Sequence, residues 1–550
     1  MKVAEAIAET MVAEGIDTVF SLLGEATMHV VSALESRGVK VVDCRHEGAA
    51  MAMADGYSRA SGKPVVCAVT TGPAFAHTLV PLTSASRTRS QVVVFTGLRN
   101  IDNLGDRQRM DHQGIARMAG VEYRPLHDPG NVVERTREVM DLVRSSGKPV
   151  VFDVAEEVQT EDWPWEVEPR PAPAWLETQR IQPDPEFLAR AVAMLESAAK
   201  PVILAGVGAV HSGAREELIA LAAETGALLA TSLDAKTLFD GDPFNAGIAG
   251  LYSSDPVMEL FAESDCVVSF GASLNGYTLA KGYLFPNARI IQVDVAPPRP
   301  MASGKAADLY LQSDALAAAR ALRKELAEAG SSGKTGYRTP EVAARLAGVV
   351  IDPKEIEVPP GELDPRQVTA EIDALLPESV GFATGLSGHF WSFTALHMTR
   401  RRDPMILGTY VGAIGYGVPV GIGAALADPG RPLVVFEGDG SLMQNIHALD
   451  TAARHNVRVL IVVMNNESLG AELYKMQLNG LNAELSNAPG VDIAGIATAF
   501  GCRAITATDM DQVRSFVQEF LAGGGPYLLD ARISRAVMSR TFRRANLGES

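Results

Sequence analysis

Two short polar segments, Gly438-Asp439-Gly440 and Asn465-Asn466, constrain the fold of this chain most strongly, because each directly follows a run of apolar residues. A helical pattern separates the two apolar runs, so the region is expected to form a parallel strand–helix–strand unit. Both strands of such a unit end at the same edge of the sheet. Asp439 and Asn466 are therefore expected to emerge side by side.

The side chains expected at this edge predict a site for a metal ion and a diphosphate. Carboxylate and amide oxygens are ligands that suit Mg2+ or Ca2+. Gly438 and Gly440 allow backbone N–H groups to approach a diphosphate, and the helix expected after Ser441 favours negative charge at its N-terminus. Taken alone, the pair of asparagines would instead indicate a simple turn.

Length and composition indicate a multidomain globular protein without a nucleic-acid partner. The chain of 550 residues exceeds one ordinary core, and 47% apolar with 21% charged residues is typical of globular proteins in water. A net charge of −17 disfavours binding to a phosphate backbone. The first 16 residues show an amphipathic helical pattern broken by Glu5, Glu9 and Glu14, which fits neither a signal peptide nor a membrane span.

The four cysteines indicate the redox compartment of the protein. Cys44, Cys67, Cys266 and Cys502 are widely scattered and show no metal-binding spacing. We expect buried free thiols, which suit a reducing compartment. Together with the N-terminal pattern, this predicts a cytoplasmic protein with no membrane partner.

Two segments rich in proline or glycine, 158–186 and 330–365, divide the chain into three predicted domains, 1–165, 185–330 and 360–540. Each domain alternates short apolar runs with helical patterns, which indicates parallel sheets buried on both faces. The predicted fold class is α/β, with three doubly wound parallel-sheet domains. The runs expected to form strands include 39–44, 64–69 and 91–95, then 201–205, 266–270 and 289–293, and finally 433–436, 457–464 and 526–530.

Two further motifs carry residues suited to chemistry. Glu47 lies in the run Arg45-His46-Glu47-Gly48, where a predicted strand gives way to a helix. In isolation, an acid there would merely favour the helix dipole. The second motif is the glycine-rich run 408–417, which by itself would indicate only a close-packed start of a helix.

These three motifs together resemble those of the thiamine diphosphate (ThDP)-dependent enzymes. In that family, GDG is followed by about two dozen residues and then NN, and here 24 residues separate Gly440 from Asn465. The resemblance covers the whole chain, in the order pyrimidine-binding, middle and diphosphate-binding domain. It is nearest to the group of acetolactate synthase, benzaldehyde lyase and 2-hydroxyacyl-CoA lyase. It implies ThDP and Mg2+ as cofactors, and self-association as a dimer or dimer of dimers with active sites at the subunit interface.

The resemblance also implies roles for individual residues. Glu47 would hydrogen-bond N1′ of the aminopyrimidine, which favours the imino tautomer whose N4′ removes the C2 proton of the thiazolium. Ile414 would be the wedge between the two rings, and the carbonyl of Gly412 would accept from the 4′-amino group. Asp439, Asn466 and the backbone carbonyl of Ser468 would bind Mg2+. The other residues expected to contact the cofactor are Gly385, Leu386, Ser387, His389, Gly438, Gly440, Ser441, Leu469 and Gly470.

The residues on the substrate side follow from the same resemblance. Besides Glu47, the candidates for catalysis are His29, His77 and Gln108. Because no His-His pair follows Gly97, the chain departs from the pattern of simple aldehyde-releasing decarboxylases.

The middle domain carries part of a dinucleotide-binding pattern. The run Gly206-Val207-Gly208-Ala209 follows a predicted strand, but His211 breaks the dinucleotide-binding pattern. FAD or ADP is left open, and a purely structural site is preferred.

The predicted function is that of a ThDP- and Mg2+-dependent enzyme that forms or cleaves a C–C bond in a small molecule. The substrate would be a 2-oxo acid or a 2-hydroxy ketone, as for acetolactate synthase. One alternative is an enzyme like 2-hydroxyacyl-CoA lyase or oxalyl-CoA decarboxylase. A second is a catalytically silent ThDP-binding subunit, against which the intact Glu47 argues.

Overall fold

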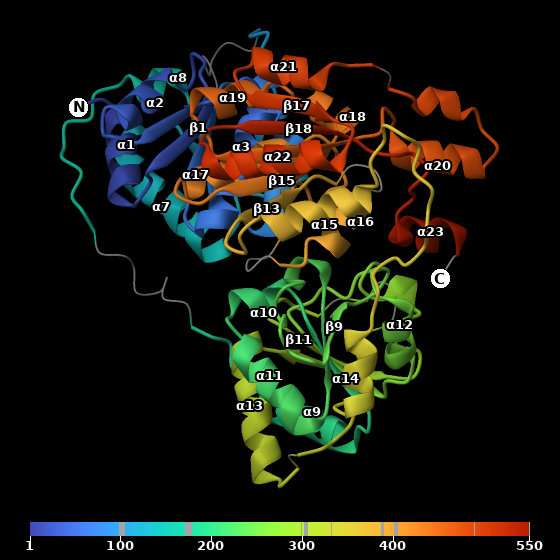
Figure 1. Cartoon of the computed structure of the whole chain (residues 1–550). Coiled ribbons are helices and arrows are strands. Elements are labelled where there is room, and N and C mark those ends of the chain that lie inside the picture. Colours follow the sequence, from blue (N-terminus) through green and yellow to red (C-terminus); the bar gives the residue numbers. More distant parts are fainter. Residues whose placement is uncertain are drawn as a thin grey trace. The chain divides into compact units, whose positions relative to one another are not determined.

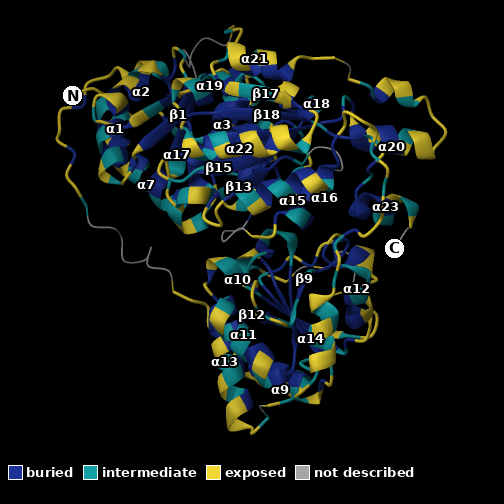
Figure 2. Ribbon diagram, in the orientation of Figure 1, coloured by how far each residue is buried: buried dark blue, intermediate teal, exposed yellow. Residues whose placement is uncertain are grey.

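The computed structural model describes residues 1–97, 105–170, 179–298, 300–301, 306–331, 333–386, 390–400, 405–488 and 490–548. The chain forms two compact units (Figure 1). The first consists of Met1–Glu177, Val358–Thr394 and Ile406–Arg535, and the second of Thr178–Glu357, Ala395–Met405 and Ala536–Ser550. The first contains two parallel sheets and the second contains one, and the strands are buried between helices with exposed outer faces (Figure 2). No helix in the described part of the chain is long and apolar enough to cross a membrane.

The first unit begins with a parallel six-stranded sheet in the order β2-β1-β3-β4-β6-β5. Every residue of β3, β4 and β6 is buried, as predicted for strands covered on both faces. The strands are β1 Thr18–Leu22, β2 Lys40–Asp43, β3 Val65–Val69, β4 Val92–Thr96, β5 Glu122–Leu126 and β6 Val150–Val154. The helices are α1 Val3–Ala13, α2 Met28–Glu35, α3 Glu47–Ser61, α4 Pro73–Ala76, α5 Leu79–Thr88, α6 His112–Ala119, α7 Val132–Ser146 and α8 Glu156–Gln159.

A second parallel sheet lies in the first unit, in the order β14-β13-β15-β16-β18-β17. When the strands of each sheet are numbered in chain order, the two sheets have the same strand order. The strands are β13 Gly381–Thr384, β14 Ile406–Leu407, β15 Leu433–Gly438, β16 Val459–Asn465, β17 Arg503–Ala507 and β18 Tyr527–Arg532. The helices of this part of the chain are α15 Pro365–Leu375, α17 Gly417–Ala427, α18 Asp439–Gln444, α19 Ala448–Arg454, α20 Gly470–Leu478, α21 Ile493–Ala499 and α22 Met510–Ala522. Helix α16 Trp391–His397 is divided between the two units, and α23 Arg540–Leu547 belongs to the second.

The sheet of the second unit has the order β12-β11-β10-β7-β8-β9, which is that of a dinucleotide-binding fold. The strands are β7 Pro201–Ala205, β8 Leu228–Thr231, β9 Asn245–Ile248, β10 Cys266–Phe270, β11 Arg289–Asp294 and β12 Leu309–Gln312. The helices are α9 Pro185–Ser197, α10 Val207–His211, α11 Arg215–Thr225, α12 Asp255–Ala262, α13 Ala315–Glu328 and α14 Pro340–Ala347. The predicted fold class of three doubly wound parallel-sheet domains is confirmed.

The glycines that follow β7 have a structural reason. A Cβ atom on Gly206 or Gly208 would overlap the backbone of Gly271, which follows the neighbouring strand β10. The backbone N–H of Gly206 also donates to the carbonyl of Phe270, at 2.8 Å. These glycines therefore allow two loops to pack closely, whether or not a nucleotide binds beside them.

The four cysteines are buried and free, as predicted. Burial raises the pKa of Cys44, Cys266 and Cys502 to about 12. They are therefore thiols rather than thiolates at neutral pH, which makes them poor nucleophiles.

The two sheets of the first unit are joined by the close packing of α3 against α17. A Cβ atom on Gly56 would overlap the carbonyl of Val420, and one on Gly423 would overlap that of Met53. Beside this contact, Arg45 forms an ion pair with Asp450 at 2.6 Å. The absence of side chains at the two glycines lets the two helix backbones approach each other.

Replacing Gly423 by alanine should therefore destabilise the first unit. We expect a loss of about 1–3 kcal/mol from overpacking, which exceeds the gain of about 1 kcal/mol in helix propensity. Thermal unfolding followed by circular dichroism measures the effect. Ala60→Ser, at an exposed position of α3, is the control and should change stability by less than about 0.5 kcal/mol. An unchanged midpoint for Gly423→Ala would contradict the close approach of the two helices.

Candidate functional site

The predicted strand–helix–strand unit is present, and its strands end at the same edge of the sheet. β15 pairs with β16 in parallel, with Gly438 opposite Met464. Asp439 and Asn466 are the residues that directly follow these two strands, and both are buried. The helix begins at Asp439 rather than after Ser441, and the helical pattern predicted between the two strands is divided into α18 and α19.

The carboxyl group of Asp439 is buried without a cationic partner. Burial raises its pKa to about 6, although the backbone N–H of Gly440 donates to it. Arg535 acts on it only through its longer-range charge, and none of the described residues forms an ion pair with it. A desolvated carboxylate gains most from a counter-charge bound beside it. The donor set of Asp439 and Asn466 therefore fits a hard cation.

The loop after β16 is held in one conformation by Arg535. Its guanidinium donates to the carbonyls of Asn466 and Glu467, each at 2.6 Å, and to Oδ1 of Asn487 at 3.0 Å. Within the loop, Oδ1 of Asn466 accepts from the backbone N–H of Ser468 at 3.1 Å. Arg535 is not among the residues predicted from the sequence. A signal for Arg535 in the sequence was its position three residues after β18, the strand that pairs with β16.

The glycine-rich loop is tied to the start of α18. The N–H of Gly415 donates to Oγ of Ser441 at 2.7 Å, and its carbonyl accepts from Nδ2 of Asn445 at 2.9 Å. Gly412 and Gly415 have φ values of +76° and +95°, which glycine adopts without strain. Ile414 lies between them and is only partly buried. The structure thus brings the predicted wedge residue next to the GDG segment.

Glu437 is a buried carboxyl group that the sequence analysis did not assign. It accepts from the N–H of Gly417 at 2.9 Å and of Gly438 at 3.2 Å, and burial raises its pKa to about 7. A Cβ atom on Gly385 would overlap this side chain. Glu437 therefore joins the end of β15 to the loop after β13 and to the start of α17. The sequence signal for Glu437 was an acidic residue inside an otherwise apolar strand.

Of the predicted loop after β13, only part is described. The N–H of Gly385 donates to the carbonyl of Phe436 at 2.8 Å, and Leu386 is partly buried. Ser387 and His389 lie outside the described residues. Downstream of Asn466, Leu469 is 41% exposed and its side chain lies near Gly440, while Gly470 starts α20.

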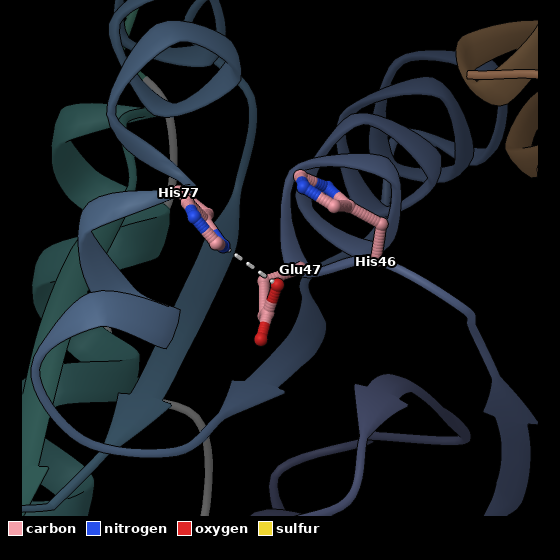
Figure 3. A group of neighbouring side chains, drawn as sticks. All are labelled: His46, Glu47 and His77. Carbon is pink, nitrogen blue, oxygen red and sulfur yellow. Dashed lines mark hydrogen bonds and ion pairs between the residues drawn. The ribbon is translucent and has the colours of Figure 1, made fainter. Parts of the chain in front are cut away.

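Glu47 and His77 are brought together at the edge of the first sheet (Figure 3). Glu47 is the first residue of α3, as predicted, and His77 directly follows α4. Oε2 of Glu47 lies 3.0 Å from Nδ1 of His77. The side chain of Glu47 is 14% exposed and that of His77 is 55% exposed.

Two more histidines surround this pair. The ring of His46 stacks on that of His77 with centroids 5.0 Å apart, and lies 5.4 Å from that of His447. Nδ1 of His46 accepts from the N–H of Gly48 at 3.0 Å. Burial lowers the pKa of His46 and of His447, so both are neutral near pH 7.

Nitrogen and oxygen atoms of His46, Glu47 and His77 lie within 4.8 Å of one another, as in some metal centres. However, Nδ1 of His46 is engaged with the backbone, and Glu47 is bonded to His77. The group is therefore a hydrogen-bonded cluster rather than a preformed metal centre.

The loop that carries His77 is held by a buried network that the sequence analysis missed. The N–H of Gly72 donates to Nε2 of His112 at 2.9 Å, so the ring proton of a neutral His112 lies on Nδ1, 2.9 Å from Asp153. Tyr123 donates to the same carboxylate at 2.7 Å. These residues are far apart in the sequence, and no local pattern announces their contact.

The other two candidates on the substrate side are not joined to Glu47. The backbone carbonyl of Gln108 packs against Gly72, but its side chain is exposed. His29 lies on α2 rather than in the preceding loop, and lines a surface groove with Met28 and Gln159. Neither side chain contacts Glu47 in the described part of the structure.

The chain matches three family models along its length. They are the N-terminal TPP (thiamine pyrophosphate) binding domain of thiamine pyrophosphate enzymes over 1–119, their central domain over 188–322 and their C-terminal TPP binding domain over 385–531.

Similar proteins match almost the whole chain. Sulfoacetaldehyde acetyltransferase of Rhodobacter capsulatus is 28% identical, over 99% of this chain and 96% of its own. A probable acetolactate synthase large subunit of Methanocaldococcus jannaschii is 26% identical, over 98% and 92%. A probable 2-ketoarginine decarboxylase of Pseudomonas aeruginosa is 28% identical, over 96% and 93%.

The chain therefore belongs to the thiamine diphosphate-dependent enzymes, the family that its motifs predicted. Its cofactor is thiamine diphosphate. Within the family, it is an enzyme of the carboligase and decarboxylase class.

The role of Glu437 in joining the loops can be tested by Glu437→Gln. The amide nitrogen would face backbone N–H donors and leave at least one of them unsatisfied, which costs about 1–3 kcal/mol. We expect a lower unfolding midpoint for the apo protein, by about 2–4 °C per kcal/mol for domains of this size. Glu472→Gln, at an exposed position of α20, is the control. Equal midpoints for the two variants would show that the carboxylate does not hold the loops.

Proposed function

We propose that this enzyme forms or cleaves a C–C bond next to a carbonyl group, using ThDP together with Mg2+. The substrate is a free 2-oxo acid or a 2-hydroxy ketone. The observation that carries the proposal is the buried carboxyl group of Asp439, which has no ion pair among the described residues and lies beside Asn466. Similarity to proteins named as synthase, acetyltransferase and decarboxylase supports the choice of reaction.

Three residues that follow β15 and β16 would bind the metal. Asp439 and Asn466 offer side-chain oxygens, and Ser468 offers its backbone carbonyl. Mg2+ keeps several ligands that are not protein, which leaves room for oxygens of the diphosphate. Gly438, Gly440 and Ser441 on one side, and Leu469 and Gly470 on the other, would surround that diphosphate, together with Gly385, Leu386, Ser387 and His389.

The organic part of the cofactor would lie against Ile414 and Gly412. An aliphatic side chain that is partly exposed can support a ring without reacting with it. When bound, ThDP supplies a nucleophilic carbon and an electron sink. Glu47 would hold or release a proton at the aminopyrimidine, and the partly buried loops would limit the access of water.

The two halves of this site would come from different subunits. Within one chain, the hydrogen bond of Glu47 leads to His77, and none of the contacts of Glu47 in the described residues reaches Asp439 or Asn466. A homodimer, or a dimer of dimers, would bring Glu47 of one chain to the metal-binding edge of another. Obligate association of this kind makes the active site depend on subunit contacts.

Asp439→Asn tests the metal site. The substitution removes the negative charge but keeps the shape, so the affinity for ThDP in the presence of Mg2+ should fall by about 100-fold or more. Calorimetric titration of the apo protein with ThDP, with and without Mg2+, measures this loss. Asp511→Asn, at a largely exposed position, should bind as the wild type does. Binding by Asp439→Asn that still depends on Mg2+ with wild-type affinity would refute the assignment.

A substrate panel and Glu47→Gln test the reaction. Incubation with 2-oxo acids and 2-hydroxy ketones, and separately with CoA thioesters, should give products by mass spectrometry only from the free acids or ketones. Glu47→Gln keeps the size of the side chain but not its proton chemistry, so turnover should fall by about 100- to 10,000-fold. Conversion of CoA thioesters alone would favour the CoA-dependent alternative. Absence of any product, with C2–H exchange of bound ThDP equal in both proteins, would favour a silent subunit.

A further inference from the structure

The carboxyl group of Glu47 has one partner among the described side chains, and that partner is His77. Oε2 of Glu47 and Nδ1 of His77 are 3.0 Å apart, which is a hydrogen bond of ordinary length. The two residues belong to different turns, one at the start of α3 and the other after α4. One carboxylate oxygen is therefore engaged, and Oε1 is left for another partner.

The ring of His77 is held in place from two directions. Its face stacks on His46 at an interplanar angle of 21°, and the backbone fixes His46 in turn through the N–H of Gly48. Its loop is held by the hydrogen bond from Gly72 to His112. This support from separate parts of the sheet keeps Nδ1 of His77 directed at Glu47, as preorganised sites require.

Histidine can keep this hydrogen bond in both protonation states of Glu47. When the carboxyl group is ionised, Nδ1–H of the neutral ring donates to Oε2. When Oε2 carries a proton, its O–H donates to Nδ1, and the single ring proton lies on Nε2. A neutral imidazole can therefore act at Nδ1 as the donor to a bare Oε2 or as the acceptor from a protonated Oε2.

We infer that His77 is a positioning residue for Glu47: it fixes Oε2 in both protonation states and so directs Oε1 toward the cofactor. This inference rests on the proposed role of Glu47 at the aminopyrimidine. It assigns His77 to the carboxyl group rather than to the substrate, and it predicts that the two residues act as a coupled pair.

His77→Ala and His77→Asn test the inference. Alanine removes the hydrogen bond, so kcat should fall by about 10- to 100-fold, which corresponds to the loss of one hydrogen bond to a charged group. KM should change by less than about 3-fold. The affinity of the apo protein for ThDP, measured by calorimetry, should fall by several-fold. Asparagine can place a donor or an acceptor where Nδ1 lies, so it should restore both quantities to within about 3-fold of the wild type. His211→Asn, at an exposed position of the second unit, is the control.

The double variant Glu47→Gln/His77→Ala shows whether His77 acts through Glu47. A positioning role predicts that His77→Ala changes kcat and ThDP affinity by less than about 3-fold once Glu47 is glutamine. Additive effects, equal defects in His77→Asn and His77→Ala, or a wild-type His77→Ala would each overturn the inference. If Glu47→Gln itself retains full turnover, the proposed function fails first, and that result is distinct from a failure confined to the His77 variants.

Discussion

The second sheet of the first unit depends most on the hydrogen bonds that the buried carboxyl group of Glu437 accepts. This group lies at the end of β15, where it accepts hydrogen bonds from Gly417 and Gly438, and Gly385 passes close enough that no side chain would fit there. A buried carboxyl group is costly unless such donors surround it. Here those donors lie at the start of α17 and at the end of β15, and Gly385 lies directly after β13, so one buried group connects the three segments that carry candidate cofactor-binding residues.

The two sheets of the first unit share one strand order. This order determines where the predicted functional residues lie. Relative to the chain, both sheets read 2-1-3-4-6-5, so the direction of winding reverses beside the first strand. In open parallel sheets, ligands bind outside the carboxyl ends of the strands near such a reversal. The GDG segment follows β15 at this point, and the loop of Gly72 and His77 follows β3, the corresponding strand of the first sheet.

Local patterns were enough to predict nine of the strands, the fold class and the positions of Glu47 and Asp439. Each of these is encoded by residues close together in the sequence: an apolar run followed by a short polar turn. The residues that hold the loops are of another kind. Arg535 lies 69 positions from the carbonyl of Asn466 that it binds, and His112 lies 40 from Gly72, so only the fold brings them together. The division of α18 from α19 was missed because the apolar pattern continues across it.

The three acidic residues at these edges differ in the hydrogen-bond donors that the chain offers to each carboxyl group. Glu437 is surrounded by backbone donors and needs nothing further. Glu47 has a histidine on one carboxylate oxygen, and its other oxygen has no hydrogen bond to a described side chain. Asp439 is buried with local backbone donors only. Burial raises the pKa of Asp439 to about 6 and that of Glu437 to about 7, so the two carboxyl groups differ in the segments that donate to them and not in the direction of the shift. Asp439 is therefore the carboxyl group at which we propose a bound cation, and beside Asn466 that cation would link the protein to the diphosphate.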